Sequence, residues 1–487
     1  MSGFRVLVVG LFVVIISILT GVVQDVRDAQ AIPAFARKYD FACNVCHVPG
    51  FPKLNDFGNV FRDQGYQLGT DGDLPTFEAL GKGFWPVSFR TTVGYQVANL
   101  RVDGQTLATS GFGFTGLDIL SFGTLARNLS FGIVYTPGLK EAGFGTGTSL
   151  TDNNLESAFV RVMNLERFVG GAGNTYWANL KVGKFELDLP FSEKRAPTLN
   201  TPFVMYHYTP GSPYIVNISG QLLNGFGNAN TFGLGDNQPG IELTGIKRTD
   251  VTGGYFRYSL GGYTTNGGSF TDAAGNGGFG RSAYFYGHVT QSFGGYGIVA
   301  GHRIGAFVAA GNAPTLCPAS TGGGALPMDV GCPQPGSATQ GEPFRRVGVD
   351  VSLTYGGQWN LFGAWMFGYD SSNLFSSQGV ANAQNAHWNG GFIELDYNPI
   401  QLPKWLFIYR YDWITNTQQG NADTTLIPGN FNNVQSHTIM ARYYIHQSTR
   451  TDLALHAEYN YYRDTTVGGS GGNLYGQTTL VGFDFAF

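Results

Sequence analysis

Most of the chain alternates apolar and polar side chains with a period of two residues, in short runs separated by turns rich in Gly, Asn, Asp and Ser. In the run at 347–355, three Val, a Leu and a Tyr occupy one face, and Gly, Asp, Ser and Thr occupy the other. The run at 452–461 repeats the pattern, and the run at 405–413 places five aromatic side chains on one face. Because successive side chains of a strand point to opposite faces, these runs predict a mainly β fold from Phe84 to the C-terminus.

The composition favours one kind of β fold. Aromatic residues make up 14% of the chain and charged residues only 13%, about half the share that is usual in soluble proteins. A membrane β-barrel that encloses water requires an apolar outer face and polar side chains inside; a β-sandwich, a glycine-rich secreted adhesin or an all-β enzyme is the alternative. At roughly 25 residues per strand and turn, residues 84–487 have room for about 16 antiparallel strands. We therefore predict a transmembrane outer-membrane β-barrel over this range.

The last strand supports the same interpretation. The chain ends in VGFDFAF, in which apolar side chains alternate up to the terminal Phe487. A closing strand that ends in an aromatic residue resembles the assembly signal of bacterial outer-membrane proteins. The alternative is an ordinary aromatic edge strand, which on a soluble protein would be exposed and prone to aggregation.

The N-terminus has the pattern of an export signal. Arg5 precedes eighteen near-apolar residues at 6–23, and Ala29-Gln30-Ala31 is a cleavage site of the A-x-A type. Such a run also suffices for an uncleaved membrane anchor, but the cleavage site favours a signal peptide over 1–31. In both cases the chain leaves the cytoplasm. The net charge of −4 gives no indication of a nucleic-acid partner, and we expect none.

A Cys-x-x-Cys-His motif follows the predicted signal peptide, at Cys43, Cys46 and His47. This is the attachment pattern of a c-type haem, in which two cysteines form thioethers with the porphyrin and the adjacent histidine is the proximal iron ligand. A Cys43–Cys46 disulfide or half of a zinc site is the alternative. However, no second Cys-x-x-Cys completes a zinc cage, and the βαβ context of a redox disulfide is missing. We predict one covalent haem c.

The flanks of the motif predict a small helical domain. Pro33 stands where a helix can start, and Phe57 and Phe61 fall on one face of a second helical stretch. A core of this size rarely folds without a cofactor or another staple, and a covalent haem would supply one. We predict a monohaem c-type cytochrome domain over 32–69 and a linker over 70–83.

The predicted domain lacks a common sixth ligand for the iron, because residues 49–83 contain neither His nor Met. The iron is then five-coordinate, or an unusual group serves, or the ligand comes from the barrel. Met205 and His207 lie in a loop-like stretch that can bend towards a haem, whereas Met440 and His456 lie on strands at inward-facing positions. Each has an ordinary packing interpretation as well; of the four, we favour Met205 or His207.

The stretch at 312–343 is too long and too rich in Pro and Gly for a periplasmic turn. It has the character of an extracellular loop, with Cys317 and Cys332 closing a ring of 16 residues. A disulfide between them would stabilise the protein by roughly 3 kcal/mol. We predict a structural bridge rather than a redox pair.

Together, the haem motif, the linker, the large barrel and the terminal Phe resemble the fused monohaem cytochrome–porins of iron-oxidising bacteria. The local matches are PAFARKYDFACNVCH at 33–47, FPKLNDFGNVFRDQGY at 51–66 and VGKFELDLPFSEKR at 182–195. The resemblance covers most of the chain in architecture, but specific motifs only in these stretches.

The resemblance implies an outer-membrane electron conduit, an oxidoreductase of the iron:cytochrome c type that oxidises extracellular Fe(II). Electrons would pass to a periplasmic c-type cytochrome or copper protein, with the haem domain on the periplasmic side or in the barrel lumen. The implied roles are haem attachment for Cys43 and Cys46 and iron ligation for His47. The resemblance assigns no role to the charged residues of the third match. We favour the interpretation that they belong to a charged strand end and loop: Lys184, Glu186, Asp188 and Glu193.

Two other functions stay open at this stage. One is a solute-transporting porin in which the haem domain is only a plug or anchor. The other is a surface haem oxidoreductase that uses another donor, or that sends electrons outward to an extracellular acceptor. The residues themselves do not fix the direction of electron flow.

Overall fold

The computed structural model describes most of the chain from residue 33 onward. The described residues are 33–41, 45–48, 52–69, 73–102, 105–137, 155–170, 175–199, 203–208, 233–235, 237–249, 254–264, 283–294, 301–316, 338–372, 384–418, 432–447, 451–466 and 474–487. The predicted signal peptide, Cys43, and the predicted disulfide between Cys317 and Cys332 lie outside them. None of the helices in the described part is long and apolar enough to cross a membrane.

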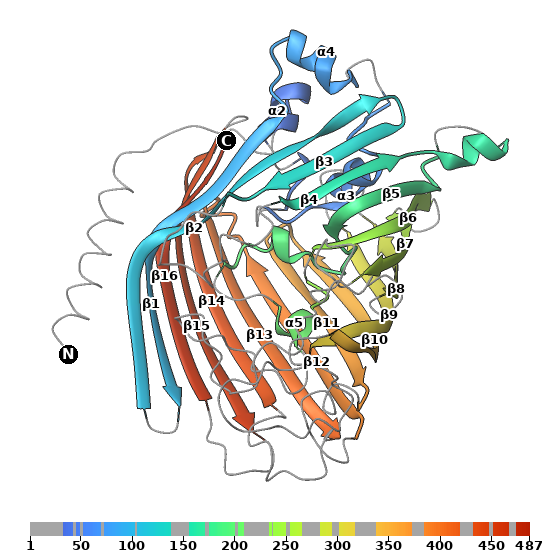
Figure 1. Cartoon of the computed structure of the whole chain (residues 1–487). Helices are drawn as coiled ribbons and strands as arrows, with labels where there is room; N and C mark the ends of the chain where they lie inside the picture. The colour runs from blue at the N-terminus through green and yellow to red at the C-terminus, as the bar shows by residue number, and fades with distance from the viewer. Residues whose placement is uncertain are drawn as a thin grey trace.

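Sixteen antiparallel strands within these residues form a closed barrel (Figure 1). In chain order the strands are β1 (Val87–Val102), β2 (Gln105–Ala126), β3 (Leu129–Tyr135), β4 (Leu155–Val162), β5 (Asn179–Glu186), β6 (Asn237–Thr249), β7 (Gly254–Thr264), β8 (Ala283–Phe293), β9 (His302–Leu316), β10 (Ala338–Tyr355), β11 (Trp359–Asp370), β12 (Ala386–Tyr397), β13 (Trp405–Gln418), β14 (Asn432–Gln447), β15 (Asp452–Thr466) and β16 (Leu474–Ala486). Each strand pairs with its neighbour in the chain, and β1 pairs with β16. The predicted strand number and fold class of the barrel are confirmed.

The first and last strands close the barrel. β1 and β16 pair from Arg90 with Ala486 to Val102 with Leu474. Beyond the ladder, the Phe487 N–H donates to the Phe89 carbonyl at 2.9 Å and the Phe89 N–H donates to the Phe487 carbonyl at 2.7 Å. The terminal aromatic residue therefore contributes directly to the closing seam.

The outer face of the wall is apolar, as the alternation predicts. On β10, Val347, Val349 and Val351 are 52%, 54% and 40% exposed, whereas Asp350 between them is 4% exposed. On β13 the outward aromatic residues alternate with inward Arg410. An apolar exterior of this kind suits a barrel that is surrounded by lipid.

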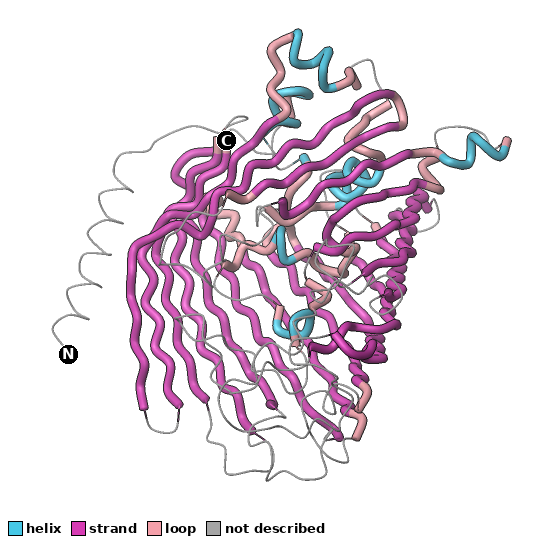
Figure 2. The backbone as a smooth tube through the Cα atoms, in the orientation of Figure 1, coloured by secondary structure: helices cyan, strands magenta, loops and turns pink. Residues whose placement is uncertain are grey.

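The inner face differs from the prediction of a polar, water-filled lumen. The described residues of the Leu187–Tyr208 segment, 187–199 with η3 (Glu193–Arg195) and 203–208 with α5 (Val204–His207), lie inside the wall, and α5 packs against β12 and β13. Its side chains form one buried cluster with inward-facing aromatic residues such as Phe362, Trp388 and Phe392. Figure 2 shows these helices and loops surrounded by the strands. The lumen is therefore partly filled by a hydrophobic core, because the returning segment must bury its own apolar side chains.

The described residues before β1 (33–41, 45–48, 52–69 and 73–81), called the N-terminal segment below, form short helices at one end of the barrel and inside it. They are α2 (Pro33–Tyr39), α3 (Asp56–Asp63) and, within the predicted linker, α4 (Thr76–Gly81). The Asn55 side chain caps α3 by accepting from the Gly58 N–H at 2.8 Å. Phe35, Phe61 and Tyr66 pack together and against Phe122 of β2. These helices thus share apolar contacts with the wall, and a separate cytochrome domain over 32–69 stays a prediction.

The two ends of the barrel differ in the lengths of their connections. Short connections join β6 to β7, β10 to β11 and β14 to β15, and long ones at the opposite end join β3 to β4, β7 to β8 and β9 to β10. The start of β1, the end of β16 and α2 lie at the end with short connections (Figure 1). In bacterial barrels the short turns face the periplasm and the long loops face outward.

Deletion of Phe487 tests the role of the closing seam. It removes the two backbone hydrogen bonds to Phe89, each with a net contribution of about 1 kcal/mol, together with a terminal aromatic side chain. We expect slower assembly and protease-sensitive material, measured as the heat-modifiable fraction on gels. Phe483→Ala, which removes an outward aromatic residue of the same strand but keeps the terminal bonds, is the control. Assembly of the deletion variant at the parent's rate would contradict the prediction.

Candidate functional site

The described half of the Cys-x-x-Cys-His motif is held rigidly against the start of α3. Cys46 and His47 are each 5% exposed. His47 forms an antiparallel bridge with Leu54, and the Asn55 N–H donates to the Cys46 carbonyl at 2.9 Å. Gly58 permits this packing, because a Cβ at that position would lie 2.1 Å from the Cys46 carbonyl oxygen.

The orientation of the His47 ring is fixed by two backbone carbonyls. Nδ1 lies 2.9 Å from the Pro52 oxygen and 3.2 Å from the Lys53 oxygen. A carbonyl only accepts, so Nδ1 carries the proton and the lone pair of the neutral ring is on Nε2. Burial lowers the pKa of His47 to about 4, which keeps the ring neutral at ordinary pH. In metal sites, a histidine whose Nδ1–H donates to a carbonyl binds the metal through Nε2.

Cys46 has the properties of a buried thiol rather than of a reactive thiolate. Burial raises its pKa to about 12. Redox-active cysteines have lowered pKa values in electropositive, partly exposed surroundings. Among the described residues no group of three or more His, Cys, Asp or Glu side chains is arranged to hold a metal ion.

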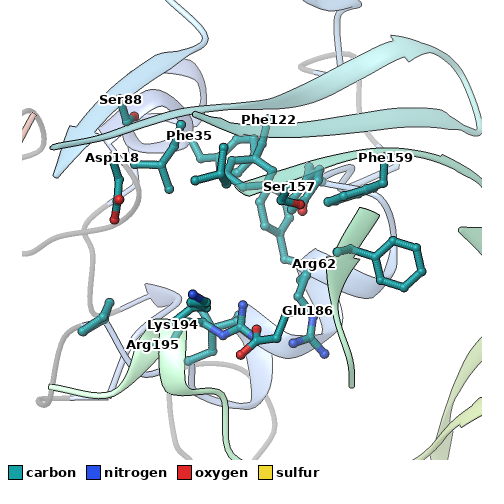
Figure 3. Close-up of a pocket in the computed structure, with 18 of the residues that line it drawn as sticks. Phe35, Arg62, Ser88, Asp118, Phe122, Ser157, Phe159, Glu186, Lys194 and Arg195 are labelled. Atoms are coloured by element: carbon teal, nitrogen blue, oxygen red, sulfur yellow. The ribbon is translucent and has the colours of Figure 1, made fainter. Parts of the chain in front are cut away.

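Cys46 and His47 line a large cavity between the N-terminal segment and the barrel wall. It holds about 1470 Å³ of empty space, a figure that includes space open to solvent. Aromatic rings from several elements line it: Phe35, Phe61, Tyr66, Phe122, Phe159 and Phe185. In Figure 3, Phe35 and Phe122 lie on one side, and Arg62, Lys194 and Arg195 lie across the space from them.

The cavity suits a porphyrin that is attached to the motif. Its aromatic rings provide apolar contacts for a flat macrocycle, and its Lys and Arg side chains provide donors for carboxylates. The side chains of Cys46 and His47 reach the same space. Cys43, the other predicted attachment residue, lies outside the described residues.

Buried ion pairs fasten the N-terminal segment to the barrel. The guanidinium of Arg257 on β7 donates to Asp63 of α3 and to Asp188, which follows β5; its Nη2 lies 2.5 Å from Asp188 Oδ1. On the far side of the segment, Lys53 pairs with Asp396 of β12. Because these contacts join one short segment to several strands, they fix its position in the lumen.

Asp56 adds a second anchor at the same end of the barrel. Its carboxylate accepts from the Gly301 N–H at 2.7 Å, from the Ser292 hydroxyl at 3.2 Å and from the Tyr255 hydroxyl at 3.3 Å. These donors stand at the starts of β7 and β9 and near the end of β8. α3 is thereby tied to the end of the barrel with short connections.

The four proposed sixth ligands lie in the lumen but not in the cavity wall. Met205 is buried in the core around α5, and His207 Nε2 lies 2.6 Å from Glu193 Oε2. Met440 and His456 face inward, as the alternation predicts, and each is fully surrounded by wall residues. A sixth ligand from Met205 or His207 stays a prediction.

The charged stretch at 182–195 contributes more than the sequence interpretation assigned to it. Asp188 holds Arg257, Glu186 pairs with Arg195 at 3.2 Å, and several of its residues line the cavity. No pattern in the sequence identified Arg161 and Arg257, two of the buried arginines of the wall. Arginine at an inward position of a predicted strand could have indicated a buried charge. The residues that it contacts could not be identified, because they are remote in the sequence.

Comparisons with known proteins add a general likeness. No protein-family model and no curated protein matches the chain. Among solved structures it is similar to an anion-selective porin from Comamonas acidovorans, with 11% identity over 82% of this chain and 99% of that one and a TM-score of 0.47. It is also similar to Pseudomonas putida OprB, with 12% identity over 84% and 96% of the chains and a TM-score of 0.45. These values are too low to carry an argument about function.

The buried pairing of Arg257 predicts how the N-terminal segment responds to acid. Burial acts to raise the pKa of Asp63 and of Asp188, but Arg257 outweighs it and holds both values below their usual range. A carboxyl with a lowered folded pKa stabilises the fold above its unfolded pKa, and that stability is lost as the pH falls through the folded value. We expect protease resistance of the segment to stay constant from neutral pH to about pH 4, near the unfolded pKa of Asp.

Arg257→Leu tests this pairing. It leaves the buried carboxylates of Asp63 and Asp188 with Arg62 as their remaining cation. Breaking buried ion pairs in this way costs up to about 3–5 kcal/mol, so the N-terminal segment should become protease-sensitive at neutral pH. Arg248→Leu, at an exposed position of the neighbouring strand, is the control. Equal protease resistance of Arg257→Leu and the parent would show that the ion pairs do not hold the segment.

Proposed function

We propose that this protein is an outer-membrane electron conduit that oxidises extracellular Fe(II) and passes single electrons to a periplasmic carrier. The observation that carries the proposal is the position of Cys46 and His47, which face a large aromatic and cationic cavity inside a closed barrel. The acceptor would be a small c-type cytochrome or copper protein. The protein would act as an oxidoreductase of the iron:cytochrome c type.

Cys43 and Cys46 would hold the haem by thioethers, and His47 would hold its iron through Nε2. When bound, the haem supplies a one-electron couple between ferric and ferrous iron. The carbonyls of Pro52 and Lys53 keep the His47 ring in the required tautomer. Phe35, Tyr66 and the other rings of the cavity would shield part of the haem from water.

The filled lumen supports electron transfer over solute flow. The Leu187–Tyr208 segment packs its apolar side chains against the inner wall, and the N-terminal segment occupies the end with short connections. Electrons cross such packed protein over limited distances, whereas solutes need a water-filled path. The extracellular donor would approach from the end with long loops, and the periplasmic partner from the opposite end.

A solute-transporting porin is the second candidate. The closed sixteen-stranded barrel with an apolar exterior favours it, because porins have this architecture. In that function the N-terminal segment would be a plug. The two functions make opposite predictions about solute flux.

Removal of Cys43 and Cys46 tests whether these residues attach a haem. In the variant Cys43→Ala, Cys46→Ala we expect complete loss of covalent haem staining and of the haem reduction that Fe(II) causes in the parent. Cys46→Ala alone removes one of two thioethers and should leave partial staining, which makes it the matched control. Covalent staining that persists in the double variant would refute the attachment residues, and a haem that Fe(II) does not reduce would refute the donor.

Swelling of liposomes separates the conduit from the porin. Because described segments of the chain fill part of the lumen, we expect liposomes with the parent protein to take up uncharged sugars no faster than protein-free liposomes. Liposomes with an open sixteen-stranded porin are the positive control. Sugar uptake at the porin's rate would favour the solute channel.

A further inference from the structure

Arg161 is a buried cation in the wall of the cavity that Cys46 and His47 line. It lies on β4, paired in register with Lys181 of β5, and is 3% exposed. Its Nη1 donates to the Arg62 carbonyl of α3, and its guanidinium carbon lies 5.8 Å from the centre of the Phe159 ring. The side chain therefore reaches from the barrel wall towards the N-terminal segment, along the edge of the cavity.

The other cations of the cavity wall have carboxylate partners within the protein. These pairs are Arg62 with Asp63, Arg90 with Asp118, Lys181 with Glu242, Lys194 with Glu156, Arg195 with Glu186, and Arg257 with Asp63 and Asp188. Among the described residues, no carboxylate forms an ion pair with Arg161, whose only hydrogen bond there is to a neutral carbonyl. Its Nε atom is buried and makes no hydrogen bond to the described residues.

A buried, unpaired guanidinium is costly, and arginine cannot escape the cost by releasing its proton. Lys181, its neighbour on β5, carries the same charge, and the Lys181 Nζ lies 2.5 Å from its own partner Glu242. The missing negative charge must therefore come from something that enters the cavity. The planar fork of a guanidinium matches a carboxylate with two parallel hydrogen bonds.

We propose that Arg161 binds a carboxylate of the covalently attached porphyrin. This inference rests on the proposed function, because it requires a haem on the Cys-x-x-Cys-His motif. Haem carries two propionate side chains, and an apolar macrocycle against Phe159 and Phe185 would present one of them to the cavity edge. Arg161 then acts as a positioning residue, which orients the macrocycle and sets the charge beside it.

The charge of Arg161 should be visible in the reduction potential. A cation near the porphyrin disfavours ferric iron, which has one more positive charge than ferrous iron, so its removal should lower the potential. In Arg161→Gln we expect the ferric form to be favoured by up to tenfold, which is about 59 mV for a one-electron couple. The unpaired propionate should also hold its proton to higher pH, and the potential should then fall as the pH rises through that ionisation.

The experiment measures the midpoint potential of the full-length, haem-bearing protein in detergent as a function of pH. Arg161→Lys keeps the charge, so its ratio of ferric to ferrous haem at a given applied potential should stay within threefold of the parent's ratio. Arg346→Gln is the matched control, because Arg346 is also 3% exposed but pairs with Asp370 at 2.7 Å, away from the cavity. Its potential should equal that of the parent. If Arg161→Gln does not assemble, Arg161→His replaces it, and its potential should fall as the histidine loses its proton.

The outcomes distinguish this inference from the proposed function. A parent without covalent haem overturns both. A haem-bearing parent whose potential is matched at every pH by Arg161→Gln, or by Arg161→His, overturns only the role of Arg161. If inorganic phosphate shifts the midpoint potential of the parent but not that of Arg161→Gln, then Arg161 binds a free anion. That result would overturn the proposal that Arg161 binds a porphyrin carboxylate.

Discussion

The structure depends first on the closure of β1 onto β16. Open sheet edges leave backbone N–H and C=O groups without partners, and within a lipid bilayer no water is present to satisfy them. The antiparallel ladder of sixteen strands removes these edges, and the paired backbones of Phe89 and Phe487 extend the seam to the last residue. Closure also creates an interior, and the chain must then fill it or leave it to water.

This chain fills much of its described interior with its own segments. The Leu187–Tyr208 segment brings apolar side chains to the middle of the barrel, where the wall offers aromatic residues such as Trp388 and Phe392. Nearer the short connections, charged residues dominate: Arg257 joins α3 to the segment after β5, and Lys53 reaches Asp396 on the other side. Each buried charge requires a partner in so dry an environment, so the position of the N-terminal segment is tightly defined.

The cavity beside Cys46 and His47 lies where these two kinds of packing meet. Aromatic rings come from α2, α3 and the wall, while the cations come from α3, from β1, β4, β5 and β7, and from the segment that follows β5. A ligand in this space contacts apolar rings over its faces and charged groups at its edge. That combination agrees with the proposal of an amphipathic, planar cofactor with carboxylates.

The sequence by itself determined the features that depend on local patterns. Strict alternation, as at Val347, Val349 and Val351, predicted the strands, their outward faces and their approximate number, because the two-residue period of a strand is a local property. The Cys-x-x-Cys-His motif is also a local pattern, and the covalent haem that it indicates stays a prediction. Only the tertiary structure decided which inward residues meet. Arg161 and Arg257 belong to no motif, and Met205 and His207 lie in the core or beside Glu193 rather than in the cavity wall. The contact of Arg257 with Asp63 joins residues 194 positions apart, and such contacts form only when the barrel closes around the segments inside it.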